Sequence, residues 1–237
     1  MTQPPPLVGV YNNPAHTMTK DVFPVLSKYA IPFRTMTRDD IAALEPGAVN
    51  VLLMPGGWYF FDEPLNDRIR AFVRAGGGYV GICCGQINAC KLGLIQAKTY
   101  SMFGMGPGYI EPVAGNHPVL KGVAKRSQAK HRKWDRIDML RYNGWPMLIK
   151  PGSKTAMVAA YDMDKELAAI AAAEYGRGRV VAFSPHPEGC IGRPGEFRDR
   201  DKLPIAYDPF QMNTAPMLYN AIFWVARRRI LSAAKTG

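Results

Sequence analysis

The chain has 237 residues, of which 47% are hydrophobic and 21% are charged; this composition is that of a globular protein and excludes a fibrous or wholly disordered chain. Its length fits one large domain, residues 1–237, better than two small ones. The formal net charge is +11, but the densest basic runs, residues 121–136 and 227–229, have neither the aromatic interleaving of a single-strand binder nor zinc-finger spacing, so nucleic-acid binding is not favoured.

The cysteines bear on the compartment and on metal binding. Cys83, Cys84, Cys90 and Cys190 occur in a chain with no recognisable signal peptide and no apolar run long enough to span a bilayer. This pattern predicts a cytoplasmic protein with no membrane segment, in which free thiols are the default. Because no C-x-x-C pair or Cys/His metal spacing is present, we expect neither a metal site nor a structural disulfide.

Short apolar runs alternate with amphipathic segments in the first half of the chain, which predicts alternating strands and helices. Thr19 or Asp21 is expected to cap the first helix. In chain order we expect a strand at 7–11, a helix ending at residue 29, a strand at 32–35, a helix at 39–44, a strand at 50–54, a helix at 65–75, a strand at 79–83 and a helix at 86–92.

The second half is less regular between residues 104 and 152, where antiparallel strands are expected around 138–142. Further strands are predicted at 156–162, 168–175 and 178–184, with Gly176 and Gly178 in a hairpin turn, before a closing helix at 214–234. Repeated strand–helix–strand units predict an α/β fold with a mostly parallel sheet and helices on both faces. Ligands of such sheets bind at the carboxyl ends of the strands.

Residues 81–85 (GICCG) form a candidate nucleophile elbow between a predicted strand and a predicted helix. Its glycines permit the tight turn, and the central Cys83 is then held in a strained conformation that projects its side chain above the sheet. The positive end of the following helix stabilises a thiolate. The alternative is that two small apolar cysteines simply pack at a tight turn.

A cysteine nucleophile needs a base, and the chain has four histidines: His16, His117, His131 and His186. His186 is the best placed, because it follows an apolar strand and so lies at the active edge of the sheet. Glu188, two residues on, is positioned to orient the imidazole as the third member of a triad. The alternative is a histidine in a proline-rigidified turn beside a solvated glutamate.

An oxyanion hole requires backbone amides aimed at the developing negative charge. Gly56 and Gly57, at the end of the strand 50–54, supply amides free of side chains, and the amide of Cys84 is the expected partner. Trp58, directly after this loop, is a candidate wall of the substrate pocket, and Asn143 is a candidate donor to a substrate carbonyl or carboxylate. Packing for Trp58 and a turn for Asn143 are the alternatives.

Residues 54–57 (MPGG), 81–85 (GICCG) and 184–188 (SPHPE) stand in an order that resembles class I glutamine amidotransferases. Residues 76–83 and 142–144 further resemble the amidotransferase-like domain found at the N-terminus of some biotin–protein ligases and in stand-alone hydrolase-like proteins. The likeness covers residues 5–230. It implies a flavodoxin-like three-layer sandwich, with Cys83 as nucleophile, His186 as base, Glu188 as orienting group, and Gly57 and Cys84 as oxyanion donors.

The resemblance implies acyl transfer from a small-molecule amide, with no metal or organic cofactor, in a homodimer or beside a separate ammonia-using partner. Glutaminases of the class usually carry Gln four places after the nucleophile; this chain has Ile87 there, and Gln86 one residue earlier is the candidate substrate contact. The related DJ-1/PfpI proteins usually place His directly after the nucleophile, where this chain has Cys84. Alternatives of other classes are a non-catalytic binding or regulatory protein that retains the pocket, and a polyanion binder acting through residues 121–136.

Overall fold

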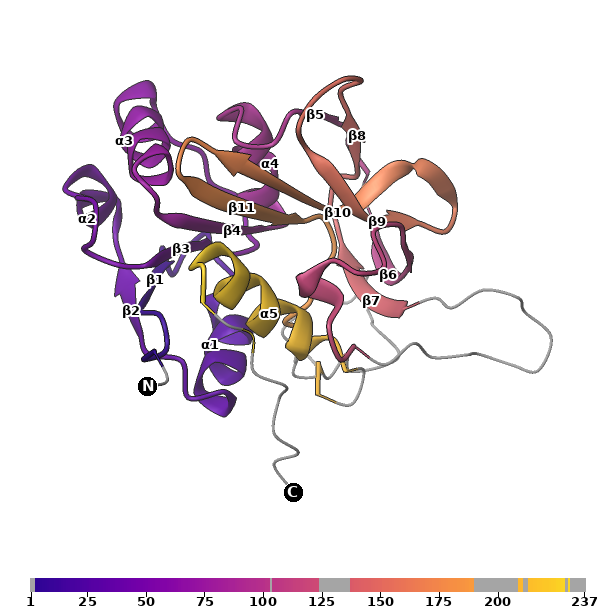
Figure 1. The fold of residues 1–237 in the computed structure, drawn as a ribbon, viewed down its shortest axis with the longest axis horizontal. Helices are drawn as coiled ribbons and strands as arrows, with labels where there is room; N and C mark the ends of the chain where they lie inside the picture. The colour runs from indigo at the N-terminus through magenta and orange to yellow at the C-terminus, as the bar shows by residue number, and fades with distance from the viewer. Residues whose placement is uncertain are drawn as a thin grey trace.

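The computed structural model describes residues 3–102, 104–123, 137–189, 209–210, 213–228 and 230. Within this part of the chain, the strands form one mixed sheet of eleven strands, and the helices lie on its two faces (Figure 1). The predicted basic residues from Lys125 to Arg136, together with Cys190 and Arg229, lie outside the described residues.

One side of the sheet is parallel, as the strand–helix alternation predicted. Its inner strands at residues 8–11, 51–54 and 78–82 are buried along their whole length because helices cover both faces, whereas the edge strand at 33–36 is partly exposed. In spatial order they are β2 (Phe33–Met36), β1 (Val8–Tyr11), β3 (Val51–Met54), β4 (Gly78–Ile82) and β11 (Gly178–Phe183).

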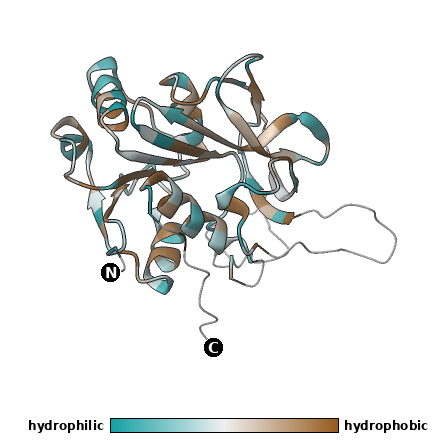
Figure 2. Ribbon diagram, in the orientation of Figure 1, coloured by the Kyte–Doolittle hydropathy of each residue, from teal (hydrophilic) through white to brown (hydrophobic). Residues whose placement is uncertain are grey.

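Two helix layers enclose this parallel side. On one face, α1 (Thr19–Lys28) and α5 (Ala215–Val225) pack in a single hydrophobic cluster with Val8, Val80 and neighbouring strand residues. On the other face, α2 (Arg38–Ala42), α3 (Glu63–Arg74) and α4 (Cys84–Lys91) pack against Leu52 and Tyr79. Figure 2 shows hydrophobic residues concentrated along the central strands and one side of α3. The predicted three-layer α/β sandwich is therefore confirmed.

The other side of the sheet is antiparallel, and its strands begin beside β11. Here β11 pairs with β10 (Asp164–Tyr175), and β9 (Ala156–Tyr161), β6 (Met105–Pro112) and β7 (Ile137–Tyr142) follow in order. Off this path, β8 (Met147–Ile149) pairs with β10 and with β5 (Ala97–Thr99), and a 3-10 turn, η1 (Pro118–Leu120), precedes the gap at 124–136. Antiparallel strands thus form a larger part of the sheet than the first half of the sequence indicated.

Three local predictions were wrong. Neither Thr19 nor Asp21 caps α1: the N-cap is Met18, without a side-chain cap, and Thr19 Oγ1 instead donates to Asn12 Oδ1 (2.8 Å). The closing helix ends at Val225 and not at residue 234. At the β10–β11 hairpin, Gly176 takes the turn with a φ of 57°, whereas Gly178 already pairs with Tyr175.

The early end of α5 has a clear backbone cause. Arg227 takes a left-handed φ of 55°, its amide donates to Trp224 O (3.1 Å), and the amide of Arg228 donates to Phe223 O (2.9 Å). This pair of bonds is the Schellman arrangement that satisfies the last carbonyls of a helix. The arrangement usually contains glycine, so an arginine there gave no stop signal in the sequence.

Candidate active site

Cys83 lies in the tight turn that joins the buried strand β4 to helix α4. Its backbone has φ 52° and ψ −107°, and its amide donates to Phe183 O (2.8 Å) of the neighbouring strand. A Cβ at Gly85 would overlap the carbonyl oxygen of Met54, so only glycine lets the helix begin this close to β3. A non-glycine residue with positive φ is costly unless its surroundings fix it, and here they do.

His186 and Glu188 follow β11 directly, beside the turn that holds Cys83. Both side chains are fully buried, and His186 Nδ1 lies 2.9 Å from Glu188 Oε1. His186 Nε2 has no partner at full hydrogen-bonding distance among the described residues, but the Cys83 thiol is close enough to interact with the imidazole. A loose pair of this kind is common in enzymes without substrate, where catalytic hydrogen bonds tighten only later.

The surroundings of His186 favour its protonated form. Burial alone lowers the pKa of His186, because it penalises the imidazolium, but the charge and hydrogen bond of Glu188 and the interaction with Cys83 outweigh burial and raise the pKa well above its ordinary range. The net effect of these contacts is to favour the imidazolium form of His186.

Backbone contacts on both sides fix the segment that carries His186. The amide of His186 donates to Leu140 O (2.8 Å) in β7, and Thr214 Oγ1, just before α5, donates to Pro187 O (2.8 Å). Elements far apart in sequence therefore determine where the imidazole lies.

The loop after β3 lies over the elbow. A Cβ on Gly56 would come within 2.7 Å of His186 Cε1, so this glycine makes room for the imidazole. Gly57 has a φ of 139° and lines the cavity above Cys83. The amide of Cys84 is one of the first of α4, and such amides have no acceptor within their helix. Gly57 and the amide of Cys84 thus both lie near Cys83.

The thiol of Cys84 has a different environment from that of Cys83. It donates to Tyr59 O (3.1 Å) and accepts from the amide of Tyr59 (3.4 Å), and Asn88 Nδ2 also donates to Tyr59 O (3.2 Å). Burial raises the pKa of Cys84 to about 12, so its side chain stays a neutral thiol. Its role in the structure is to join the Gly57 loop to α4.

A cavity of about 370 Å³ opens above Cys83. The predicted residues Trp58 and Asn143 line it, and Trp58 is 60% exposed. Asn143 has a left-handed φ of 50° and is tied by two bonds to Gly104, one from its own amide (2.9 Å) and one to its Oδ1 (2.7 Å). Its side-chain oxygen therefore serves the turn that the sequence alternative proposed.

The prediction for Gln86 does not fit this cavity. Its side chain is fully buried and its amide nitrogen donates to Cys90 Sγ (3.4 Å), and it is not among the lining residues. The third position of α4 faces the core, whereas the fourth, Ile87, faces the cavity.

Sequence reasoning missed several cavity residues. Tyr142 O accepts a hydrogen bond from Cys83 Sγ (3.5 Å), and Tyr142, Trp145 and Ile87 all line the cavity. From the other side, the loop at residues 15–18 completes the wall. The aromatic residues on both sides of Asn143 were the signal that could have identified this second wall.

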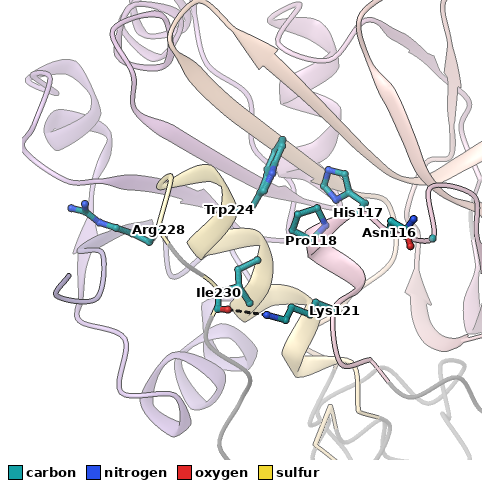
Figure 3. Close-up of a pocket in the computed structure, with 8 residues that line it drawn as sticks. Asn116, His117, Pro118, Lys121, Trp224, Arg228 and Ile230 are labelled. Atoms are coloured by element: carbon teal, nitrogen blue, oxygen red, sulfur yellow. Dashed lines mark hydrogen bonds between the residues drawn. The ribbon is translucent and has the colours of Figure 1, made fainter. Parts of the chain in front are cut away.

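A second cavity, of about 520 Å³, lies beside the C-terminal end of α5 (Figure 3). Arg179, near the start of β11, lies over the Trp224 ring, so this cavity is at the opposite end of the central strands from Cys83. Lys121 Nζ already donates to Ile230 O (3.1 Å), and Figure 3 shows Arg228 directed away from Trp224 and His117. Its cationic groups do not converge on one point.

Two further findings concern metals and membranes. Among the described residues, no group of three or more His, Cys, Asp or Glu side chains is arranged to hold a metal ion. None of the helices in the described ranges is both long and apolar enough to cross a bilayer.

The fold is similar to that of several solved α/β proteins, glutamine amidotransferases among them. No family model matches the sequence, and no curated protein matches it. The structure is similar to a chain of PurLQS from Thermotoga maritima, with a TM-score of 0.64 and 15% identity over 93% of this chain and 98% of that one.

Two solved glutamine amidotransferases are also similar. One from Methylobacillus flagellatus has a TM-score of 0.60 and 13% identity over 99% of this chain and 100% of that one. One from Thermotoga maritima has a TM-score of 0.59 and 14% identity over 93% and 97%. At these identities the likeness establishes the flavodoxin-like fold alone.

Proposed function

We propose that this protein is a cysteine-dependent amidohydrolase or amidotransferase-like enzyme that acts on a small amide. The observation that carries the proposal is the buried His186–Glu188 pair, 2.9 Å apart, beside a cysteine held at a left-handed φ of 52° before a helix N-terminus. A structural cysteine needs neither the strained backbone nor a protonated histidine next to it.

The first half of the reaction is acylation. The Cys83 thiolate attacks the amide carbonyl, and the amides of Gly57 and Cys84 stabilise the oxyanion of the tetrahedral intermediate. When the intermediate collapses, the C–N bond breaks and the His186 imidazolium gives its proton to the leaving nitrogen, which departs as ammonia or an amine. The acyl group is then held on Cys83 as a thioester.

The second half is hydrolysis. His186, now neutral, takes a proton from water, and the resulting hydroxide attacks the thioester to release a carboxylic acid and the thiolate. Glu188 orients the imidazole and stabilises its protonated form throughout. The scheme uses only residues of this chain, the amide and water.

We also propose a relationship to one particular group of amidotransferase-like domains. Residues 76–83 and 142–144 support a relationship to the amidotransferase-like domain of some biotin–protein ligases. In the structure these residues form the strand into the elbow and the turn beside Cys83, so the shared motifs fall at the site itself.

A partner follows from the chemistry, since ammonia released here is either lost or used elsewhere. One similar structure is of PurLQS; by analogy we propose a separate ammonia-using subunit, with a second copy of this chain as the alternative partner. We propose that the protein works in the cytoplasm as a single domain.

The proposal is tested by measuring ammonia release and by trapping the acyl-enzyme intermediate. The intact protein, incubated with a panel of primary amides, should release ammonia and, on acid quenching, show a mass increase equal to the acyl group. The Cys83→Ala variant should show neither. Ammonia release that persists in Cys83→Ala would contradict the assignment of the nucleophile.

A further inference from the structure

The walls of the cavity above Cys83 are aromatic and apolar. Trp58, Tyr142 and Trp145 line it together with Met18 and Ile87. None of the described residues that line it is a lysine, arginine, aspartate or glutamate, although the whole chain has a formal charge of +11. The described uncharged polar groups of the lining come from His16, Thr17, Cys83 and Asn143, together with the Tyr142 hydroxyl and the indole N–H groups of Trp58 and Trp145.

Both walls are held by the backbone before any ligand arrives. On one side, the amide of Met18 donates to Gly56 O (2.9 Å) and the amide of Trp58 donates to His16 O (2.9 Å). The Trp58 ring also meets Phe60 edge-on, with centroids 5.3 Å apart. On the other side, the bonds between Asn143 and Gly104 fix the turn that leads to Trp145.

We propose that this pocket selects a neutral amide bearing an aromatic or apolar group over a zwitterionic amino-acid amide such as glutamine. The inference rests on the proposed function and names its substrate class. Trp58 lines the cavity and is 60% exposed, so a flat apolar group that packs against its ring removes apolar area from water.

A zwitterionic amino-acid amide such as glutamine gains no comparable apolar contact with the Trp58 ring. Its ammonium and carboxylate would lose water on entering a cavity of about 370 Å³ whose described lining offers no opposite charge, and an unpaired buried charge is strongly unfavourable. A neutral amide brings only its reacting carbonyl and nitrogen, which the site is arranged to bind.

The test compares two primary amides with the same spacer, 4-phenylbutanamide and L-glutamine, by calorimetric titration into the Cys83→Ser variant, which prevents turnover. The expected result is that 4-phenylbutanamide binds about 100-fold more tightly, the scale set by an uncompensated charge. Equal affinities, tighter binding of glutamine, or no binding of 4-phenylbutanamide would overturn the inference.

Two wall variants test whether the aromatic residues cause the preference. Trp58→Ala and Trp145→Ala should each weaken 4-phenylbutanamide binding about tenfold, whereas Tyr100→Ala, which removes an exposed aromatic residue that does not line the cavity, should leave it unchanged. If all three variants bind like the parent, the aromatic walls do not select the ligand and the inference fails.

Different results would overturn the proposed cysteine enzyme and the proposed substrate class. Rapid alkylation of Cys83 with preferred binding of glutamine would overturn the substrate class and leave the cysteine enzyme standing. An unreactive Cys83 with preferred binding of 4-phenylbutanamide would overturn the enzyme and leave a pocket for apolar amides.

Discussion

The parallel and antiparallel sides of the sheet contribute different things to the candidate site. The parallel strands β3, β4 and β11 end at one edge, where Gly57, Cys83 and His186 follow them. The antiparallel side contributes Leu140 O, which holds the His186 amide, and the turn from Tyr142 to Trp145. The reactive side chains thus follow closely packed strands. Most of the residues that line the cavity above Cys83 lie in loops, which vary more readily in sequence.

The strand β11 belongs to both sides, since it is parallel to β4 and antiparallel to β10. We infer that substitutions of the reactive residues at the parallel edge should affect chemistry, whereas those in the antiparallel loops, like those in the Trp58 wall, should affect binding. Substitutions at Cys83, Glu188, Gly85 and Asn143 test this division.

The largest effect is expected for Cys83→Ser at the parallel edge. A hydroxyl in place of the thiolate leaves the pocket intact but removes the nucleophile, so kcat for amide hydrolysis should fall about 10⁴-fold or more. Cys90→Ser is the matched control, because Cys90 is a half-buried cysteine of the same helix that accepts a hydrogen bond from Gln86, and burial raises its pKa to about 12. Equal losses in the two variants would mean that folding, not chemistry, is affected.

The second largest loss of activity is expected for Glu188→Gln, and its size depends on pH. The charge of Glu188 offsets the effect of burial on His186, so the pKa of His186 should fall when that charge is removed. Activity needs the imidazolium, so its alkaline limb should move to lower pH, and the loss in kcat/KM, about 100-fold or more at pH 8, should be smaller at pH 6.

The control is Glu174→Gln, an exposed residue that pairs with Arg179 (3.1 Å), which should leave the profile unchanged. A Glu188→Gln profile that is lowered equally at every pH would show that the carboxylate does not act through the protonation of His186.

The third effect is on stability and is expected for Gly85→Ala in the elbow. The added Cβ would overlap Met54 O, so we expect the free energy of unfolding to fall by about 3 kcal/mol. Gly115→Ala, beside the antiparallel strands, meets nothing within 4 Å and should change stability by less than about 1 kcal/mol. Urea unfolding measures both, and similar values would mean that the elbow is not tightly packed.

The smallest effect is expected for Asn143→Ala in the antiparallel loop. It removes the acceptor for the Gly104 amide (2.7 Å) at a left-handed residue, which should cost about 1–2 kcal/mol and raise KM several-fold with little change in kcat. Asn143→Asp keeps an acceptor oxygen and should retain most of both. If Asn143→Ala instead lowers kcat alone, the residue acts in the chemistry and the division between the two sides is wrong.

Much of the parallel side could be predicted from sequence because its signals are local. Buried strands such as β3 and β4 are continuous apolar runs, and a glycine-flanked cysteine between strand and helix marks the elbow. The ordering of His186 and Glu188 after β11 places them at the same edge, because parallel strands end together.

The rest depended on contacts between distant residues. The position of Gln86 relative to Ile87 follows from the direction in which α4 leaves Cys83, and the wall at Trp145 requires β7 to lie beside the β11 segment. The end of α5 rests on Arg227 adopting a conformation usual for glycine. None of these is encoded in a local pattern.

The most direct test of the central claim is the rate at which iodoacetamide alkylates Cys83 between pH 5 and 9, in the intact protein and in His186→Ala, with mass spectrometry to locate the label. The account predicts fast labelling at neutral pH that is confined to Cys83 and slows at least tenfold in the variant. Slow labelling in both proteins, at the pH dependence of an ordinary thiol, would contradict it and favour a non-catalytic binding protein.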